Sequence, residues 1–129
     1  MVKGRRKQDF ETFIDKLKDF ASYSRSRESK LYILVIPHTC QINEYYLENM
    51  KSLGFVFGDN KQILNNDYPF IMQIQQEFKQ NPNVQILNPI QVLKNNEKEN
   101  KRMYYQNDGH LNPNGQKVIA EYILKEINL

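Results

Sequence analysis

Apolar residues recur at intervals of three and four positions in four segments of the chain, the pattern of helices with one buried face. The first of these stripes consists of Phe10, Phe13, Ile14, Leu17, Phe20 and Ala21, and the second of Ile42, Tyr46, Met50 and Leu53. Gly54 suits the end of the second helix, and Asp67 with Pro69 suits the start of the third. The predicted helices cover residues 9–21, 42–53, about 69–80 and 113–127.

Two shorter segments, Leu31–Ile36 and Val84–Leu87, are apolar without interruption. Continuous apolarity over so few residues, with β-branched side chains, favours strands that are covered on both faces, as in a parallel sheet. The pattern between these elements is less regular. We predict a minor strand or a lid over the core at residues 55–57, a turn at 58–60, a helical turn or loop at 90–93, and an exposed polar segment at 94–102.

Helices and strands alternate in this order, which indicates an α/β layer structure with right-handed crossovers. The length of 129 residues fits one domain over residues 1–129. Only two strands are well supported by the pattern, however, so the sheet would be thin and one apolar edge would stay open. Such an edge suggests that the chain belongs to something larger.

Charge and composition narrow the choice of partners. Eighteen basic and fifteen acidic residues leave a net charge of +3, which is too small a bias to indicate nucleic-acid binding. Part of the excess lies in residues 1–8, which we predict to be a flexible tail. No apolar run is long enough for a membrane span, and no apolar segment follows the basic start as in a signal peptide. The expected location is therefore cytoplasmic.

Residues 104–116 concentrate the candidate chemistry. Asp108, Gly109 and His110 place a carboxylate, a flexible backbone and an imidazole side by side. Asn112 is a good N-cap and Pro113 a good first helical residue, so the loop would be held from behind by a helix. Loops that a rigid scaffold positions often carry function.

The end of the chain resembles the C-terminal part of the SGNH (GDSL-type) hydrolase and acyltransferase superfamily, many members of which close with Asp-Gly-His-Leu-Asn-x-x-Gly and a helix. The residues that carry the resemblance are Tyr104, Tyr105, Asp108, Gly109, His110, Leu111, Asn112, Pro113, Gly115, Val118, Ile119 and Ala120. The resemblance extends over residues 8–129 and is strong only from 104 to 123. It implies a flavodoxin-like, three-layer α/β/α fold with an incomplete sheet, and an exported protein if the chain is part of a longer family member.

By this resemblance the chemistry is acyl-ester hydrolysis or O-acyl transfer, on a substrate such as a carbohydrate or lipid ester. His110 would be the general base that takes a proton from a serine, and Asp108 would orient its imidazole. Some family members place the acid one position earlier, where Asn107 stands here, but an amide cannot carry the negative charge that stabilises an imidazolium. The mechanism requires no cofactor and no metal.

The chain departs from the family in its nucleophile. It has no Gly-Asp-Ser motif, and Gly58-Asp59-Asn60 has no hydroxyl. The family's Gly-x-Asn-Asp block is also absent. We therefore expect the C-terminal half of an SGNH domain, with the serine on a complementing N-terminal segment, or else a homo-oligomer or a truncated or degenerate relative.

Other interpretations of the same residues stay open. Asp-Gly-His can be a plain turn, and the chain can be a catalytically inactive α/β module that binds or interacts. His38, Tyr105 and Asn112 are further candidates for substrate binding, although His38 fits an ordinary loop residue as well. Cys40, the single cysteine, fits a small buried residue better than a nucleophile. His38, Asp108 and His110 as a metal triad is disfavoured by the spacing of Asp108 and His110.

Overall fold

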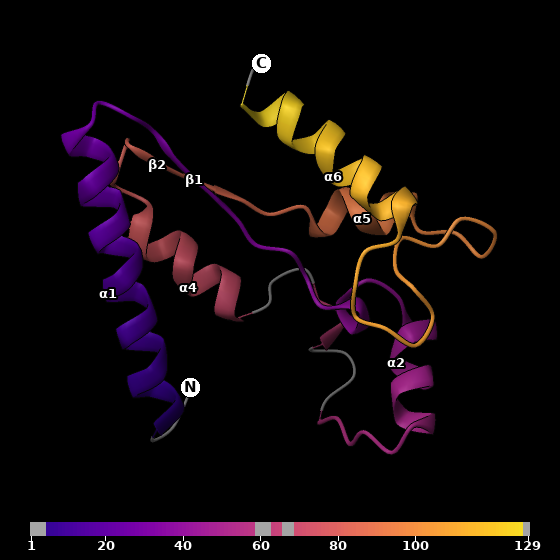
Figure 1. Ribbon diagram of the computed structural model, residues 1–129. Helices are drawn as coiled ribbons and strands as arrows, with labels where there is room; N and C mark the ends of the chain where they lie inside the picture. The colour runs from indigo at the N-terminus through magenta and orange to yellow at the C-terminus, as the bar shows by residue number, and fades with distance from the viewer. Residues whose placement is uncertain (1–4, 59–62, 66–68, 128–129) are drawn as a thin grey trace. The chain divides into compact units, whose positions relative to one another are not determined.

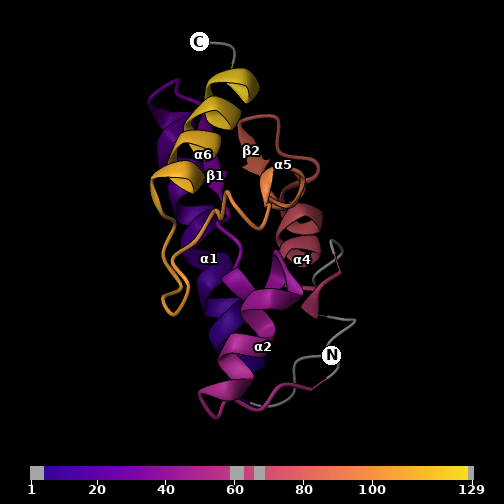
Figure 2. The same ribbon diagram turned by 90° about the vertical axis from the view of Figure 1, so that its right-hand side faces the viewer.

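The computed structural model describes residues 5–58, 63–65 and 69–127 of the chain (Figures 1 and 2). Two compact units make up the chain. Unit 1 comprises residues 1–33 and 70–86, and unit 2 comprises residues 34–69 and 87–129. Five α-helices, one 3-10 helix and a two-stranded parallel sheet occur among the described residues, which confirms the α/β class. None of the described helices is both long and apolar enough to span a bilayer.

Unit 1 begins with helix α1, Arg5–Ser26, which is longer at both ends than the predicted 9–21. Its first turn overlaps residues 5–8 of the predicted flexible tail, and residues 1–4 lie outside the described residues. The helix ends at a left-handed residue, Glu28, with φ of 53°. The N–H of Ser29 donates to the carbonyl of Ser24, and that of Glu28 to the carbonyl of Arg25, which is the pattern of a Schellman cap.

Helix α4, Pro69–Phe78, packs against α1 within this unit (Figure 1). The core residues are Ile14, Ala21, Ile71, Ile74, Phe78 and Val84. Phe70 contacts both Phe10 and Phe13, with ring centroids 5.6 and 5.8 Å apart. Part of the apolar face predicted for residues 9–21 is therefore buried, but Phe20 on that face is 62% exposed. The predicted cap Asp67 lies outside the described residues.

Strands β1, Leu31–Leu34, and β2, Val84–Leu87, pair in parallel. Strand β2 has the predicted bounds, whereas β1 ends two residues before the predicted Ile36. The prediction that both faces of this strand are covered is wrong, because Tyr32 in β1 is 38% exposed and Ile36, the last residue of the predicted strand, is 53% exposed. Continuous apolarity identified the strand, and it overestimated how much of its surface this chain buries.

Unit 2 continues from β1 into a 3-10 helix, η1 (Thr39–Gln41), and helix α2 (Glu44–Ser52). Helix α2 begins two residues later than predicted because the side chain of Asn43 caps it, accepting from the N–H of Tyr45. Gly54 follows it with φ of 91°, as predicted for a C-terminal glycine. Residues 55–57 form neither a strand nor a lid, since Val56 is 96% exposed.

Helices α5, Ile90–Asn96, and α6, Pro113–Glu126, lie side by side in unit 2 (Figure 2). The predicted turn at 90–93 is thus the start of a two-turn helix, and α6 matches its prediction to within one residue. The core cluster of the unit is formed by Ile42, Tyr46, Ile90, Leu93, Met103, Tyr104, Val118 and Ile119. These residues come from η1–α2, α5, the segment before the candidate loop, and α6.

The cap of α1 provides a test of backbone strain. Glu28→Gly should raise the free energy of unfolding by about 0.5–1 kcal/mol. Glycine removes the strain of about 1–2 kcal/mol that a non-glycine residue has in the left-handed region, and the greater backbone entropy of glycine in the unfolded chain cancels part of this gain. Urea denaturation measures the change. Ser26→Gly, in the last turn of the same helix, should instead lower stability, so a loss in Glu28→Gly would contradict the cap assignment.

Candidate functional site

The candidate residues lie on a short loop of unit 2 that spans residues 105–110. An isolated antiparallel bridge between Tyr104 and Leu111 closes the loop. The N–H of Tyr105 donates to the carbonyl of His110 at 3.2 Å, and the N–H of Asn112 donates to the carbonyl of Met103 at 3.0 Å. The loop is therefore anchored at both ends by backbone hydrogen bonds.

Asp108 and His110 are brought together as the sequence predicts. Oδ1 of Asp108 contacts Nδ1 of the imidazole, and the same oxygen accepts the backbone N–H of His110 at 3.0 Å. The second contact makes the segment an Asx turn, in which the aspartate side chain shapes its own loop. Because Asp108 engages Nδ1, Nε2 is the ring nitrogen that remains to accept a proton.

Both side chains of the Asp108–His110 pair are exposed to solvent. The side chain of His110 is 86% exposed and that of Asp108 is 54% exposed. The hydrogen bond from His110 still lowers the pKa of the Asp108 carboxyl below its ordinary value. At such exposure the interaction is screened by solvent, so it is a weaker electrostatic element than a buried catalytic pair.

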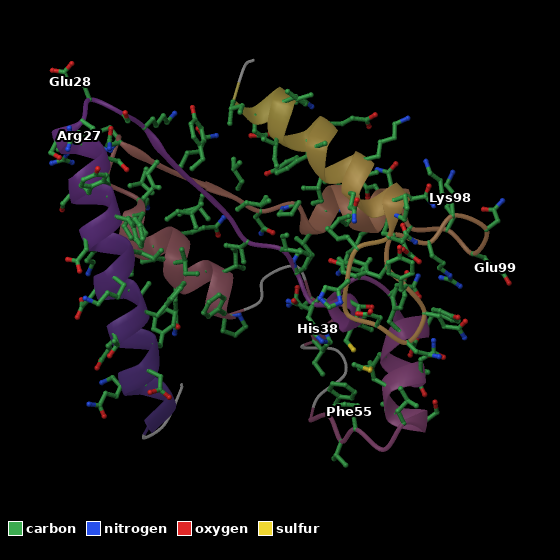
Figure 3. All side chains as sticks on the ribbon, in the orientation of Figure 1. Arg27, Glu28, His38, Phe55, Lys98 and Glu99 are labelled. Atoms are coloured by element: carbon green, nitrogen blue, oxygen red, sulfur yellow. The ribbon has the colours of Figure 1, made fainter. Side chains whose placement is uncertain are left out.

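His38 lies next to this loop, four residues past the end of β1 (Figure 3). A Cβ placed on Gly109 would come within 3.9 Å of Nε2 of His38. The other ring nitrogen, Nδ1, accepts the backbone N–H of Cys40 at 3.3 Å, and the N–H of His38 donates to the side chain of Gln41 at 2.7 Å. His38 thus caps η1 while its Nε2 edge faces the Asp108–His110 loop.

Cys40 does not offer an activated thiol. It is 2% exposed, and burial raises the pKa of the thiol, which disfavours the reactive thiolate. These properties agree with the small buried residue that the sequence favours. Among the described residues no three His, Cys, Asp or Glu side chains are placed to hold a metal ion, so His38, Asp108 and His110 do not form such a triad.

Asn112 and Tyr105, two candidates for substrate binding, differ in whether their side chains are available to a ligand. The side-chain oxygen of Asn112 accepts the N–H groups of Asn114 and Gly115, and its amide donates to the carbonyls of Arg102 and Tyr104. Its hydrogen-bonding capacity is filled by capping α6, as predicted, and by holding the preceding segment. The side chain of Tyr105 is 50% exposed and lies at the start of the loop.

Gly115 explains the close approach of α6 to the loop. A Cβ at this position would lie 2.2 Å from the carbonyl oxygen of Met103 and 2.8 Å from Leu111. Any side chain would therefore displace the backbone that carries the loop, so the Asn-Pro-x-Gly pattern has a direct packing reason.

Sequence reasoning missed the buried anchor of the site, Glu97. This residue falls in the segment predicted to be exposed, yet its side chain is only 1% exposed. Its carboxylate accepts from the hydroxyl of Tyr46 at 3.1 Å, from Arg102 at 3.0 Å and from the backbone N–H of Met103 at 2.8 Å. The prediction for 94–102 is wrong at this position because a buried carboxylate with three donors is stable where an unpaired one is not.

Two tyrosines extend this network to the loop. Burial raises the pKa of Tyr46 to about 12, so its hydroxyl stays protonated and can donate to Glu97. The same hydroxyl accepts the N–H of Tyr104 at 3.2 Å, and the hydroxyl of Tyr104 donates to the carbonyl of Pro37 at 2.6 Å. Tyr104 thereby ties the base of the loop to the segment that leads from β1 to His38.

Arg102 completes the network from its solvent side. Its guanidinium lies 3.9 Å from the ring centroid of Tyr45, which is a close cation–π contact. Glu97 and Arg102 flank a tight turn that is closed by an antiparallel bridge between Lys98 and Lys101. The opposite charges at its two ends, together with the adjacent Tyr45 and Tyr46, were the signal that the sequence carried for this arrangement. Nothing in their spacing alone, however, indicates which carboxylate is buried.

A groove between α5 and α6 is separate from the loop. It has a volume of about 360 Å³, and its lining includes Asn88, Val92, Asn95, Val118 and Tyr122. Neither Asp108 nor His110 lines it. The groove therefore does not serve as the substrate pocket of the Asp108–His110 pair.

Comparison with known proteins adds no relative. No family model, curated protein or solved structure matches the chain.

The Glu97 network should be the main support of unit 2. Glu97→Ala should lower the free energy of unfolding by about 3 kcal/mol, because it leaves Arg102 and two other donors without their acceptor. Glu99→Ala, an exposed change two residues away (Figure 3), should shift it by less than about 0.5 kcal/mol. Equal effects in thermal or urea unfolding would show that the Glu97 carboxylate is not an anchor.

The Asp108–His110 contact can be observed directly by pH titration. The depressed pKa of Asp108 means that the contact is present above the ordinary carboxyl range and is lost as the pH falls through the lowered value. In a carbon-detected NMR titration, His110→Ala should move the pKa of Asp108 upward. His38→Ala should leave it in place. An Asp108 pKa that is the same with and without His110 would show that the two side chains do not interact.

Proposed function

We propose that this chain supplies the acid–base pair, Asp108 and His110, of an SGNH-type acyl-ester hydrolase or O-acyltransferase with a flavodoxin-like α/β/α fold. The observation that carries the proposal is the contact of Asp108 Oδ1 with Nδ1 of His110, on a loop anchored at both ends. It orients Nε2 as the proton acceptor, which is the role a general base needs in acyl transfer.

The chemistry would proceed through a serine hydroxyl. Nε2 of His110 takes the hydroxyl proton while the serine oxygen bonds to the ester carbonyl carbon, and the imidazolium then returns the proton to the departing alkoxide. Asp108 stabilises the positive imidazolium from the Nδ1 side. The acyl-serine then passes its acyl group to water or to an alcohol, which distinguishes a hydrolase from a transferase.

The serine of this proposal comes from another polypeptide segment. Ser22, Ser24 and Ser26 belong to α1 and Ser29 follows it in unit 1, while the hydroxyl of Ser52 donates to the carbonyl of Asn49 in α2. None of these has the strand-to-turn setting of a nucleophile. The two-stranded sheet and the exposed Asp108–His110 pair agree with a site that a further segment would complete and shield from water.

A catalytically inactive module is the second candidate, and a specific observation favours it. Oδ1 of Asp108 accepts the backbone N–H of His110, so the aspartate has a structural reason to be present without any chemistry. Under this alternative the chain binds or interacts, and the imidazole is an exposed loop residue.

Asp108→Asn separates the two candidates, because asparagine keeps the Asx turn and loses the negative charge. An activated aryl acetate is a substrate that water can attack without a serine. With this substrate we expect wild type, in which His110 acts as the base toward water, to hydrolyse the ester faster than His110→Ala by about tenfold, a modest fraction of what a positioned base contributes in a complete site. Asp108→Asn should give an intermediate rate at unchanged stability.

His38→Ala is the matched control, since it removes the neighbouring exposed imidazole. It should retain the wild-type rate. If wild type and His110→Ala hydrolyse the ester equally fast, His110 has no role as a base and the inactive module is the correct assignment. If Asp108→Asn hydrolyses the ester as fast as wild type, the Asp108 carboxylate shapes the turn and does not contribute to catalysis.

A further inference from the structure

One face of α1 carries a stripe of aromatic and charged side chains that unit 1 buries only in part. Its members, called the α1 stripe below, are Asp9, Phe13, Lys16, Phe20, Tyr23 and Arg27. They are separated by four, three, four, three and four residues. The first five lie in α1, and Arg27 directly follows its last residue, Ser26. At 3.6 residues per turn, the six positions lie within about 40° of one line along the helix and its continuation by one residue.

The α1 stripe is exposed along its whole length. Phe13 is 40% exposed, and Phe20 and Tyr23 are each 62% exposed. On the opposite flank of the helix Ile14 and Ala21 are buried, and Lys18 pairs with Glu77 of α4 at 3.0 Å. Unit 1 therefore buries one flank of the helix and only part of the stripe, where Phe13 stacks on Phe70 of α4. Three large aromatic side chains in line are more than scattered surface hydrophobicity.

The spacing of the α1 stripe is that of a coiled-coil seam. Alternating steps of three and four residues are a heptad repeat, which keeps a stripe turned toward a partner helix over several turns. We propose that the α1 stripe pairs with the same stripe of a second copy of this chain, with the two helices antiparallel. The proposal is independent of the acyl-transfer function.

The order of side chains makes the stripe complementary to itself in this direction. With the two-fold axis at position 18, Phe13 lies opposite Tyr23 of the partner copy, and Asp9 lies opposite Arg27. A two-fold interface repeats each contact, so these four residues form two aromatic pairs and two opposite-charge pairs. Arg27 already lies 5.5 Å from the ring centroid of Tyr23, which shows that it can cover an aromatic side chain.

The centre of the seam balances its own charges. Lys16 lies opposite Phe20 of the partner copy, where its methylene stem covers the ring. Its ammonium group bonds to Asp19 at 3.2 Å within the helix. Two copies bring together two Lys16 and two Asp19 side chains, so charge on each side of the axis is compensated.

A parallel pairing lacks this complementarity. It would place Asp9 beside Asp9 and Arg27 beside Arg27, and both contacts are repulsive. The size of the surface also sets the strength. A single pair of helices of this length buries less than the roughly 800 Å² per partner of a standard interface, so we expect a weak dimer, with Kd about micromolar or above.

Sedimentation equilibrium of the full chain over a range of concentrations tests the proposal. Wild type should dimerise, and Phe20→Lys should weaken the dimer by about tenfold or more, because it removes the ring that Lys16 of the partner copy covers and places a second lysine opposite it. Leu124→Lys adds the same charge at a 52% exposed apolar residue of α6 and should leave the dimer unchanged. Far-UV circular dichroism verifies that the variants keep their helices.

Charge reversal tests the orientation. Asp9→Arg alone should weaken the dimer by about three- to tenfold, because it opposes Arg27 of the partner copy twice, and the double variant Asp9→Arg with Arg27→Asp should restore it. A monomeric wild type at the highest concentration would overturn the proposal. A dimer that Phe20→Lys leaves intact would also overturn it. So would a dimer that Asp9→Arg alone does not affect, because this is the result expected of a parallel dimer, in which position 9 faces a like charge both in wild type and in the variant.

Discussion

The buried carboxylate of Glu97 is the interaction on which unit 2 depends. It accepts from the side chains of Tyr46 and Arg102 and from the backbone of Met103, and Tyr46 in turn holds Tyr104. A charge this far from water is stable only when its lone pairs are filled. The position of the segment before the candidate loop therefore follows from satisfying one acid, and the loop is positioned by that segment and the cap of α6.

Rigid support and solvent exposure occur together in the candidate site. The ends of the loop are fixed by Tyr104, Asn112 and the contact of Gly115 with Met103, while Asp108 and His110 project from it into water. A catalytic pair gains most of its electrostatic strength from a surrounding of low dielectric. This chain supplies orientation without that surrounding, which is the physical reason why we propose that the serine lies on another segment.

The sequence predicts local features here better than burial. The cap at Asn112, the extent of α6, strand β2 and the contact of Asp108 with His110 depend on neighbouring residues, and all four are present. Glu97 is different, because its partners Tyr46 and Arg102 are brought to it by packing that no local pattern records. For the same reason Tyr32, Phe20 and Val56 are more exposed than their hydrophobicity indicates. Which face of an apolar segment is covered depends on what packs against it.

The junction of Asn114 and Gly115 has a consequence for chemical ageing. Asn–Gly pairs deamidate when the glycine nitrogen attacks the asparagine side chain to form a succinimide. Here the N–H of Gly115 is bound to Asn112 inside the first turn of α6, and the amide of Asn114 donates to the carbonyl of Arg102. The ring cannot close without opening that turn. Isoaspartate at position 114 would accordingly accumulate in proportion to the time that the start of α6 spends unfolded. The modification is covalent, so it would persist after the turn refolds.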